Sequence, residues 1–387
     1  MVLPLIAVTS LHASALTVSL LNAAAWLPWL VIGLLVGAWI DQLSERRWLM
    51  IACDAAAAAA FATVPLAWAL GDLTVAQLLL VALVAGTAAV IFNTAYRVFL
   101  RDVVDGPDDR AAGNSALQGS ASAANVAGPG LGGALVAAVG ATNALLADCA
   151  SFLVSALCLA AIRPRPRTPR AEISPAPLMH RIRDGLSYLR QDRLLLSLAC
   201  FGGAANLALV GYQSILVVFL VRETHLHPGT VGLVMGLSGF GGMAGAWLAR
   251  PLTARLGSAR ALLATKTVGG ASALLIPLAT SPTHAAFAVA GGFGVGAGIV
   301  AGNVITSTWM QGYVRPEVYA RTGAASNVIN YGTMPIGALL GGVLASTLGL
   351  AAALWVTTAM VPFGAILLYA GPLGGMRELP ASDEDVG

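Results

Sequence analysis

Long apolar stretches recur along the whole chain, and this repetition restricts the possible folds more than any other feature of the sequence. Each of eleven stretches is long enough to cross the roughly 30 Å hydrocarbon core of a bilayer as a helix. Only 10% of the residues are charged, and the stretches lack the alternating pattern of an outer-membrane β-barrel. The sequence therefore predicts an all-α integral membrane protein. We expect membrane helices at residues 18–40, 48–70, 75–100, 114–138, 141–162, 194–221, 228–249, 261–280, 284–311, 324–347 and 350–371.

The first nine residues, "MVLPLIAVT", are also apolar. As a helix they would rise only about 14 Å, which is about half of a bilayer core. The segment lacks the basic region and the cleavage site of a signal peptide. We expect it to be the end of a truncated first helix that starts before Met1, with a short re-entrant segment as the alternative.

The basic residues gather on one face of this predicted topology. Of 21 basic residues, only Arg222 falls in a loop of the opposite face, and Lys266 lies just inside a span near the arginine-rich face. Because cytoplasmic loops retain positive charge, we expect a multi-pass cell-membrane protein with a cytoplasmic C-terminus. The arginines of that face are Arg46, Arg47, Arg97, Arg101, Arg110, eight between Arg163 and Arg193, Arg250, Arg255, Arg260, Arg315, Arg321 and Arg377.

One long polar segment divides the chain into two parts. It starts as the Pro/Arg stretch "RPRPRTPR" at residue 163 and continues as a predicted amphipathic helix. Such a basic segment beside a membrane span favours lipid headgroups, rather than nucleic acid, as its partner. The predicted domains are an N-terminal helix bundle at residues 1–162, a cytoplasmic linker at 163–193, a C-terminal six-helix bundle at 194–373 and an acidic cytoplasmic tail at 374–387.

Short motifs repeat between the two parts. "GAWI" at residue 37 ends the second helix and "GAWL" at residue 245 ends the eighth, each before an arginine-bearing loop. "GPGLGG" at residue 128 is echoed by "MPIGALLGG" at residue 334. Parallel repeats of this kind are typical of transporters built from two six-helix halves.

The motif G-x3-D-x4-R-R between the second and third helices resembles the loop signature of the major facilitator superfamily. "GAWLARPLTARLGSAR" fits its degenerate second copy, and "GPGLGG" resembles the exporter motif of the fifth helix. "GNSALQGSASAANVAGPGLGG" and "RIRDGLSYLRQDRLLL" resemble the branch that contains the enterobactin exporter and macrolide-efflux proteins. The resemblance covers nearly the whole chain and implies two six-helix bundles related by pseudo-two-fold symmetry.

The resemblance also implies export by alternating access, with particular residues in named roles. A conformational latch between the second and third helices would consist of Gly37, Asp41, Arg46, Arg47, Arg97 and Arg101. The exporter motif maps to Gly128, Pro129, Gly132 and Gly133. The membrane-centre arginine that many antiporters carry in the fourth helix is absent, which argues against borrowing their proton relay.

Three ionisable residues lie within predicted spans: Asp54, Asp148 and Lys266. Such groups are costly in a bilayer and are therefore candidates for coupling. Protons are the coupling ion that we consider, and no other cofactor is expected. For Asp54 and Lys266, the alternative is a purely structural position from which the side chain reaches the boundary. No metal site is expected, because "HLH" at residue 225 offers only two ligands.

A central cavity could be lined by uncharged polar and aromatic groups, which suit an amphipathic organic molecule such as a drug, a siderophore or a natural product. Asparagines in membrane helices also often bond only to neighbouring helices. The candidates are Asn22, Trp26, Asn93, Asn206, Tyr212, Gln213, Asn303, Asn330 and Tyr331.

The leading hypothesis from the sequence is a secondary transporter, expected to act as a monomer, that exports a small organic molecule. A transport-inactive membrane protein or sensor is the alternative. A membrane-embedded enzyme is less favoured, because the five histidines lie in loops or at span edges and do not pair with acidic residues inside the spans.

Overall fold

The computed structural model describes helices along most of the chain. From the N-terminus to the C-terminus they are α1 (Val2–Thr9), α2 (Ala15–Val31), α4 (Arg46–Leu70), α5 (Val75–Val103), α7 (Ala141–Ala161), α9 (Arg193–Arg222), α10 (Pro228–Leu256), α11 (Ser258–Ser272), η1 (Ala273–Leu278), η2 (Pro282–His284), α12 (Ala285–Tyr313), α13 (Pro316–Leu348), α14 (Leu350–Ala370) and η3 (Pro372–Gly375). The structure describes residues 2–33, 36, 39–40, 43, 45–104, 138–162, 187–314, 316–381 and isolated positions between 109 and 136. For residues 97–98, 101–102, 316–321 and 324 it describes the backbone but not the side chains.

Most of the expected spans have a matching helix. Within the described part of the chain, nine helices are long and apolar enough to cross a membrane. The span expected at 18–40 corresponds to the shorter apolar helix α2. Most of the span expected at 114–138, and the linker up to residue 186, lie outside the described residues. The prediction of an all-α membrane protein is confirmed.

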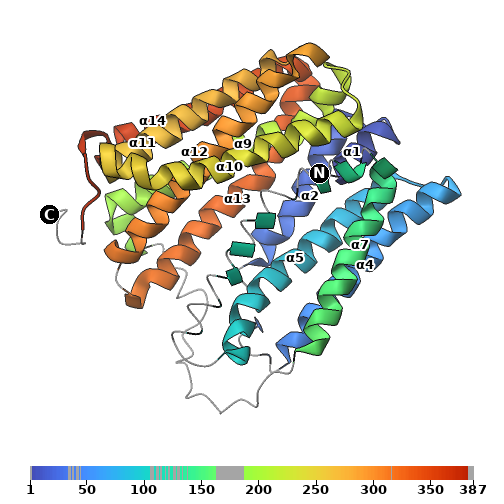
Figure 1. Ribbon diagram of the computed structural model, residues 1–387, viewed down its shortest axis with the longest axis horizontal. Coiled ribbons are helices and arrows are strands. Elements are labelled where there is room, and N and C mark those ends of the chain that lie inside the picture. Colours follow the sequence, from blue (N-terminus) through green and yellow to red (C-terminus); the bar gives the residue numbers. More distant parts are fainter. Residues whose placement is uncertain are drawn as a thin grey trace.

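The helices form two groups in space (Figure 1). The N-terminal bundle contains α1, α2, α4, α5 and α7, and the C-terminal bundle contains α9 to α14. Most helices pack mainly within their own group, whereas α2 packs on α5 and even more on α13 of the other bundle. In Figure 1 the two bundles lie closest at the upper right, near α1, and diverge toward the lower left. We call the end near α1 the Arg222 end. The opposite end, where α4 starts and α10 meets α11, is the arginine-rich end.

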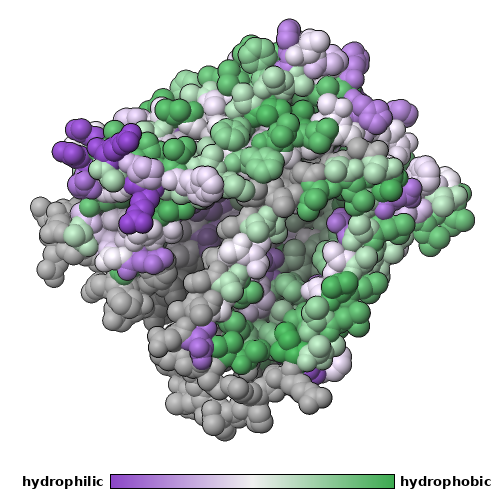
Figure 2. Space-filling model, in the orientation of Figure 1, coloured by the Kyte–Doolittle hydropathy of each residue, from purple (hydrophilic) through white to green (hydrophobic). Residues whose placement is uncertain are grey.

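The flanks of both bundles are strongly apolar. Figure 2 shows hydrophobic residues over most of the visible helix flanks, with hydrophilic residues gathered at the ends of the C-terminal bundle. Large side chains such as Trp247 and Leu157 are 78% and 70% exposed. Aqueous solvent would not tolerate so many exposed apolar groups in continuous bands. The flanks are therefore the lipid-facing surface.

Short polar side chains fix where several helices begin. Ser14 and Thr74 accept hydrogen bonds from backbone amides at the start of α2 and α5, which is the usual role of a residue that caps a helix N-terminus. Asp192 does the same for α9, accepting from the amides of Leu194 at 2.7 Å and Leu195 at 3.1 Å. These caps set the helix limits at the membrane boundary.

The last helix of each bundle starts at a glycine with nearly the same backbone conformation. Gly140, before α7, has φ 83° and ψ 159°, and Gly349, before α14, has φ 86° and ψ 160°. Other residues rarely adopt these positive φ values. The two bundles thus repeat a turn at corresponding places, in addition to the motifs that repeat in the sequence.

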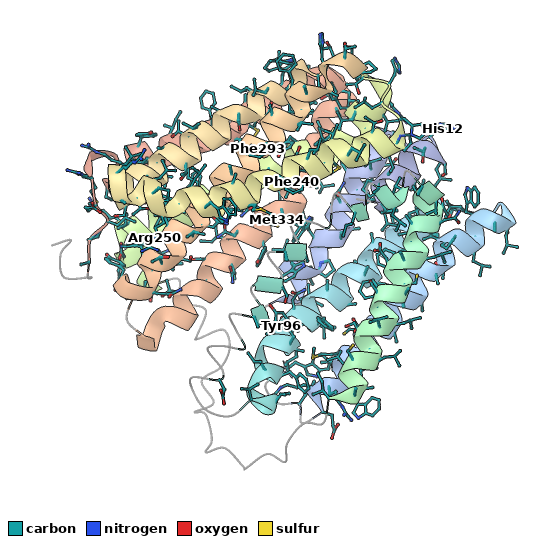
Figure 3. The ribbon with its side chains drawn as sticks, viewed as in Figure 1. His12, Tyr96, Phe240, Arg250, Phe293 and Met334 are labelled. Carbon is teal, nitrogen blue, oxygen red and sulfur yellow. The ribbon has the colours of Figure 1, made fainter. Side chains whose placement is uncertain are left out.

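Glycines bring α10, α12 and α11 into close contact. A Cβ atom at Gly241 of α10 would overlap the backbone of Phe293 in α12, and a Cβ atom at Gly245 would overlap the backbone of Ala297. Figure 3 labels Phe240 and Phe293 on these two helices. On the other side of α12, Gly298 faces Gly269 of α11 just as closely. Close packing of small residues is a main source of helix association in membranes.

Direct contact between the bundles is made mainly by α2, which packs on α13 and α9. Ser19 donates a buried hydrogen bond to the Oγ of Ser214 at 3.2 Å, and Gly342 lies against the Ser19 side chain. At the Arg222 end, Arg222 donates to the backbone carbonyls of His12 at 3.0 Å and Ala13 at 2.6 Å. The two bundles are therefore joined through α2 and through the loop that precedes it.

The C-terminal segment binds back on the start of α11. The Arg377 carbonyl accepts from the amide of Ala259 at 3.1 Å. Glu378 accepts from the amide and the hydroxyl of Ser258 at 3.0 and 2.9 Å, and these bonds hold the pKa of Glu378 below its ordinary value of 4.5. The indole of Trp309 donates to the Pro380 carbonyl at 2.9 Å. The segment thus ties the α10–α11 junction to α12.

Replacing Gly245 by alanine should destabilise the C-terminal bundle, because the new Cβ meets backbone atoms of α12 that cannot rotate away. Overpacking of this kind costs about 1 to 3 kcal/mol. Thermal unfolding in detergent should give a lower midpoint for Gly245→Ala. The matched control is Gly312→Ala, in a helix position with open space, and an equal effect in both variants would contradict the close contact.

The bond between Glu378 and Ser258 should depend on pH. Because the folded-state pKa of Glu378 lies below 4.5, its stabilising contribution is present at neutral pH and is lost as the pH falls through the folded pKa. The unfolding midpoint of Glu378→Gln should therefore lie below wild type at pH 7 and converge with it once the pH has fallen below the folded pKa. Glu223→Gln, at an exposed residue of the other end, is the control for the loss of one negative charge. A difference for Glu378→Gln that does not change with pH would contradict the assignment.

Candidate functional site

A cavity of about 420 Å³ lies within the C-terminal bundle. Its lining comes from α9, α11, α12, α13 and α14, and it combines apolar side chains with polar ones. The polar and charged lining residues are Asn206, Thr265, Lys266, Asn303, Asn327, Asn330 and Tyr331. We call this space the C-terminal cavity. Its size and mixed lining are those of a small-molecule site.

Lys266 brings a positive charge into the cavity. It lies about 12 Å along α11 from Ser258, at 1.5 Å per residue. Its Nζ donates to the Oδ1 of Asn303 at 3.1 Å and lies 5.7 Å from the centroid of the Phe201 ring. A Cβ at Gly302 would overlap the end of this side chain, so the glycine leaves room for the ammonium group.

Two further asparagines, Asn206 and Asn330, form a hydrogen-bonded pair across α9 and α13. Asn206 Nδ2 donates to Asn330 Oδ1 at 2.9 Å, and Asn330 Nδ2 donates to the Ser326 carbonyl at 2.7 Å. A Cβ at Gly202 would overlap the Asn330 side chain. The pair therefore has a defined orientation on one wall of the cavity.

Aromatic side chains form the border between the cavity and the N-terminal bundle. The Tyr331 ring stacks on Trp26 of α2, with ring centroids 6.5 Å apart, and its centroid lies 4.8 Å from that of the Trp29 ring. Met334, on the same face of α13, packs in one cluster with Ala23 and Trp26, and Figure 3 shows it beside α2. Tyr331 and Met334 thus both line the cavity and contact side chains of α2.

Four of the nine predicted cavity residues line the C-terminal cavity: Asn206, Asn303, Asn330 and Tyr331. Trp26 borders it through Tyr331. The remaining four lie elsewhere. Asn22 and Asn93 donate to carbonyls one turn back in their own helices, at 3.1 and 2.8 Å, Tyr212 is buried in the core of the C-terminal bundle, and Gln213 is exposed on α9.

The predicted latch can be followed only in part. Gly37, Asp41 and the side chains of Arg97 and Arg101 lie outside the described residues. Arg46 is buried and its Nε donates to the Ile40 carbonyl at 3.0 Å. Arg47 donates to the Ile162 carbonyl at 2.7 Å. The two arginines thus tie the start of α4 to backbone that follows α2 and α7, within the N-terminal bundle.

The two acidic coupling candidates lie in the N-terminal bundle, away from the cavity lining. Asp54 of α4 is buried, and its Oδ2 has no hydrogen-bond partner among the described residues. Asp148 of α7 is exposed. The third candidate, Lys266, is part of the cavity.

The remaining predicted motifs have simpler surroundings. Gly128 and Gly132 have open space where a Cβ would lie, while Pro129 and Gly133 lie outside the described residues. His227 accepts from the Gly229 amide at 3.3 Å and so caps α10. Among the described residues, no group of three metal-binding side chains comes together.

Two important positions are not evident from the sequence. Phe201 reads as an ordinary apolar residue, and Arg222 stands out only as an exception to the charge pattern. Lys266 is predicted as a coupling candidate, but not as a residue of the cavity. The spacing of Gly202, Asn206 and Leu209 on α9, and of Asn327, Asn330 and Met334 on α13, follows one helix face. That spacing is the sequence signal that could have located the cavity wall.

Comparison with known proteins gives consistent results along the chain. Residues 5–385 match the Transmembrane secretion effector family. The chain is 26% identical to the multidrug efflux pump Tap of Mycolicibacterium fortuitum, over 95% of this chain and 90% of that protein. It is 28% identical to the pump of the same name in Mycobacterium tuberculosis, over 96% of this chain and 89% of that protein.

Solved transporters share the fold. A bacterial homologue of the iron transporter ferroportin in an inward-facing state superimposes with a TM-score of 0.70, at 17% identity, over 96% of this chain and 93% of that one. A bacterial homologue of the lysosomal transporter Spinster, inward-facing and unoccupied, gives 0.67 at 15% identity, over 95% and 92%. The predicted superfamily is confirmed: the chain belongs to the Transmembrane secretion effector family of major facilitator transporters.

Proposed function

We propose that this protein is a secondary active exporter of small amphipathic organic molecules, with drugs as one class of cargo. The observation that carries this proposal is the C-terminal cavity, which combines hydrogen-bonding side chains with an aromatic border at the contact between the bundles. The similarity to multidrug efflux pumps along nearly the whole chain supports the same conclusion.

Alternating access is the mechanism that we propose. The bundles touch through α2 and at the Arg222 end, and they diverge toward the arginine-rich end. The cavity would take up its cargo from the arginine-rich side. A rocking motion then opens the Arg222 end while the arginine-rich end closes, and the cargo leaves on the other side.

We propose the orientation from the distribution of arginines. Cytoplasmic loops retain positive charge, so the arginine-rich end and the C-terminus would face the cytoplasm in a cell membrane. The two bundles would be separate domains at residues 1–162 and 194–373, joined by the linker at 163–193 and followed by the tail at 374–387. One copy of the chain would suffice for transport.

The latch and the coupling ion are further parts of the proposal. Asp41, with Arg97 or Arg101, would hold the arginine-rich end closed during release, while Arg46 and Arg47 brace the start of α4. Protons would drive export. Asp54 is our candidate carrier, because its Oδ2 is buried and has no hydrogen-bond partner among the described residues, and such an oxygen is costly when the carboxylate is charged.

An accumulation assay tests the proposed function. Bacteria without their own major pumps should accumulate less of an amphipathic fluorescent dye when they express this protein, and the difference should grow at lower external pH. The Tyr331→Ala variant loses its stacking on α2 and should export about three- to tenfold more slowly, since aromatic contacts contribute about 0.5 to 1.5 kcal/mol each.

The control for this assay is Phe363→Ala, which removes an aromatic side chain that is 68% exposed on α14 and lies outside the cavity lining. It should export like wild type at matched membrane levels. Wild-type protein that inserts normally but leaves dye accumulation unchanged for a panel of amphipathic compounds would contradict the exporter and favour a sensor.

A further inference from the structure

The C-terminal cavity has a positive charge without an acidic partner in its lining. Among the described residues, Lys266 is the only charged one that lines the cavity, and no aspartate or glutamate accompanies it there. Among the described residues, its Nζ contacts the side-chain amide oxygen of Asn303 and the ring of Phe201. An ammonium group inside a membrane protein is costly unless an opposite charge comes near.

The structure holds this ammonium group in a defined place. Gly302 leaves the space that the end of the side chain occupies, and the Asn303 oxygen accepts one of its three N–H donors at 3.1 Å. No second hydrogen-bond acceptor for this group is seen in the described part of the chain, so its remaining donors could bind a molecule in the cavity. Phe201, which is 8% exposed, forms an apolar wall beside it. Charge, hydrogen bonding and an aromatic surface therefore meet at one point.

Apolar groups lie across the same cavity. Its lining includes Leu209, Val295, Ile299 and Met334, and Tyr331 connects it to the tryptophans of α2. A ligand that satisfies both regions has an anionic head and an apolar or aromatic body. A cationic amphipathic molecule would satisfy only the second region and would be repelled by the first.

We propose that Lys266 binds the carboxylate of the exported molecule, so that organic anions with an aromatic or aliphatic body are the preferred cargo. This proposal rests on the proposed function for its transport step, whereas the binding step is independent of it. Asn303 orients the ammonium group, and Phe201 and Tyr331 contact the body of the cargo. The carboxylate supplies the missing opposite charge through a charge-assisted hydrogen bond.

The sequence offers a direct test, because Lys266 is the only lysine in the chain. An amine-reactive acylating reagent therefore modifies one side chain, and mass spectrometry of the peptide that contains it measures the extent of modification. The probe ligands are a xanthene dye with a free carboxylate and the methyl ester of the same dye. In a neutral detergent, the carboxylate dye should protect wild-type Lys266 and the ester should not.

Variants measure the size of the effect. Lys266→Met should weaken binding of the carboxylate dye by about tenfold or more, in line with the strength of hydrogen bonds to charged groups, and should leave the affinity for the ester unchanged. Lys266→Arg keeps the charge and should retain the preference for the carboxylate. Arg250→Gln removes an exposed positive charge from α10, outside the cavity (Figure 3), and should bind both dyes like wild type.

The outcomes separate this proposal from others. Equal protection of Lys266 by both dyes, or protection by neither dye, would overturn the proposal. Protection by phosphatidylglycerol, at a concentration at which the carboxylate dye has no effect, would also overturn it, because the lysine would then bind lipid headgroups. If the carboxylate dye binds selectively but cells that express the protein do not expel it, the carboxylate site stands and the exporter proposal fails.

Discussion

The packing of α2 against α9 and α13 is the contact on which the rest of the structure depends. It is made by small residues: a Cβ at Gly342 would overlap Ser19, and Gly211 and Gly341 bring α9 and α13 equally close together. Ser214 serves both contacts, since it accepts from Ser19 at 3.2 Å. Its own hydroxyl donates to the Gly211 carbonyl at 2.8 Å and shares this donor with the Ala338 carbonyl at 3.3 Å. Lipid offers no hydrophobic drive for helix association, so such close packing and buried hydrogen bonds supply the attraction. The position of the aromatic border follows from this contact.

The two bundles contribute unequally to the candidate site. All polar lining residues of the C-terminal cavity within the described part of the chain belong to the C-terminal bundle, whereas the N-terminal bundle contributes Trp26 and Trp29 through their contact with Tyr331. Asp54, which is buried, lies in the N-terminal bundle, as do Arg46 and Arg47 at the start of α4. In the proposed mechanism, the C-terminal bundle would therefore bind the cargo, and the N-terminal bundle would contain the latch and the proton site.

The sequence predicted the fold well and the site in part. Apolar stretches indicated an all-α membrane fold and the order of the nine spanning helices in the described part of the chain, because the bilayer penalises charge within its core wherever that charge occurs along the chain. The asparagines were harder to interpret. Asn22 and Asn330 both donate to a carbonyl one turn back, yet only Asn330 also accepts from a neighbouring helix. The sequence does not distinguish an asparagine that bonds within its own helix from one that also bonds to another helix, because the outcome depends on which helix packs against it. The surroundings of Lys266 were equally hidden, because Gly302 and Phe201 create them from other helices.

Alternating access requires the bundles to separate at the α2–α9 contact during transport, and a reversible cross-link tests this requirement most directly. Ser19→Cys and Ser214→Cys, combined after replacement of the four native cysteines, should form a disulfide, because their hydroxyl oxygens lie 3.2 Å apart. We predict that oxidation stops dye efflux and that a reducing agent restores it, while each single cysteine variant is indifferent to both treatments. Efflux at the full rate from protein that is completely cross-linked would contradict the rocking of the two bundles.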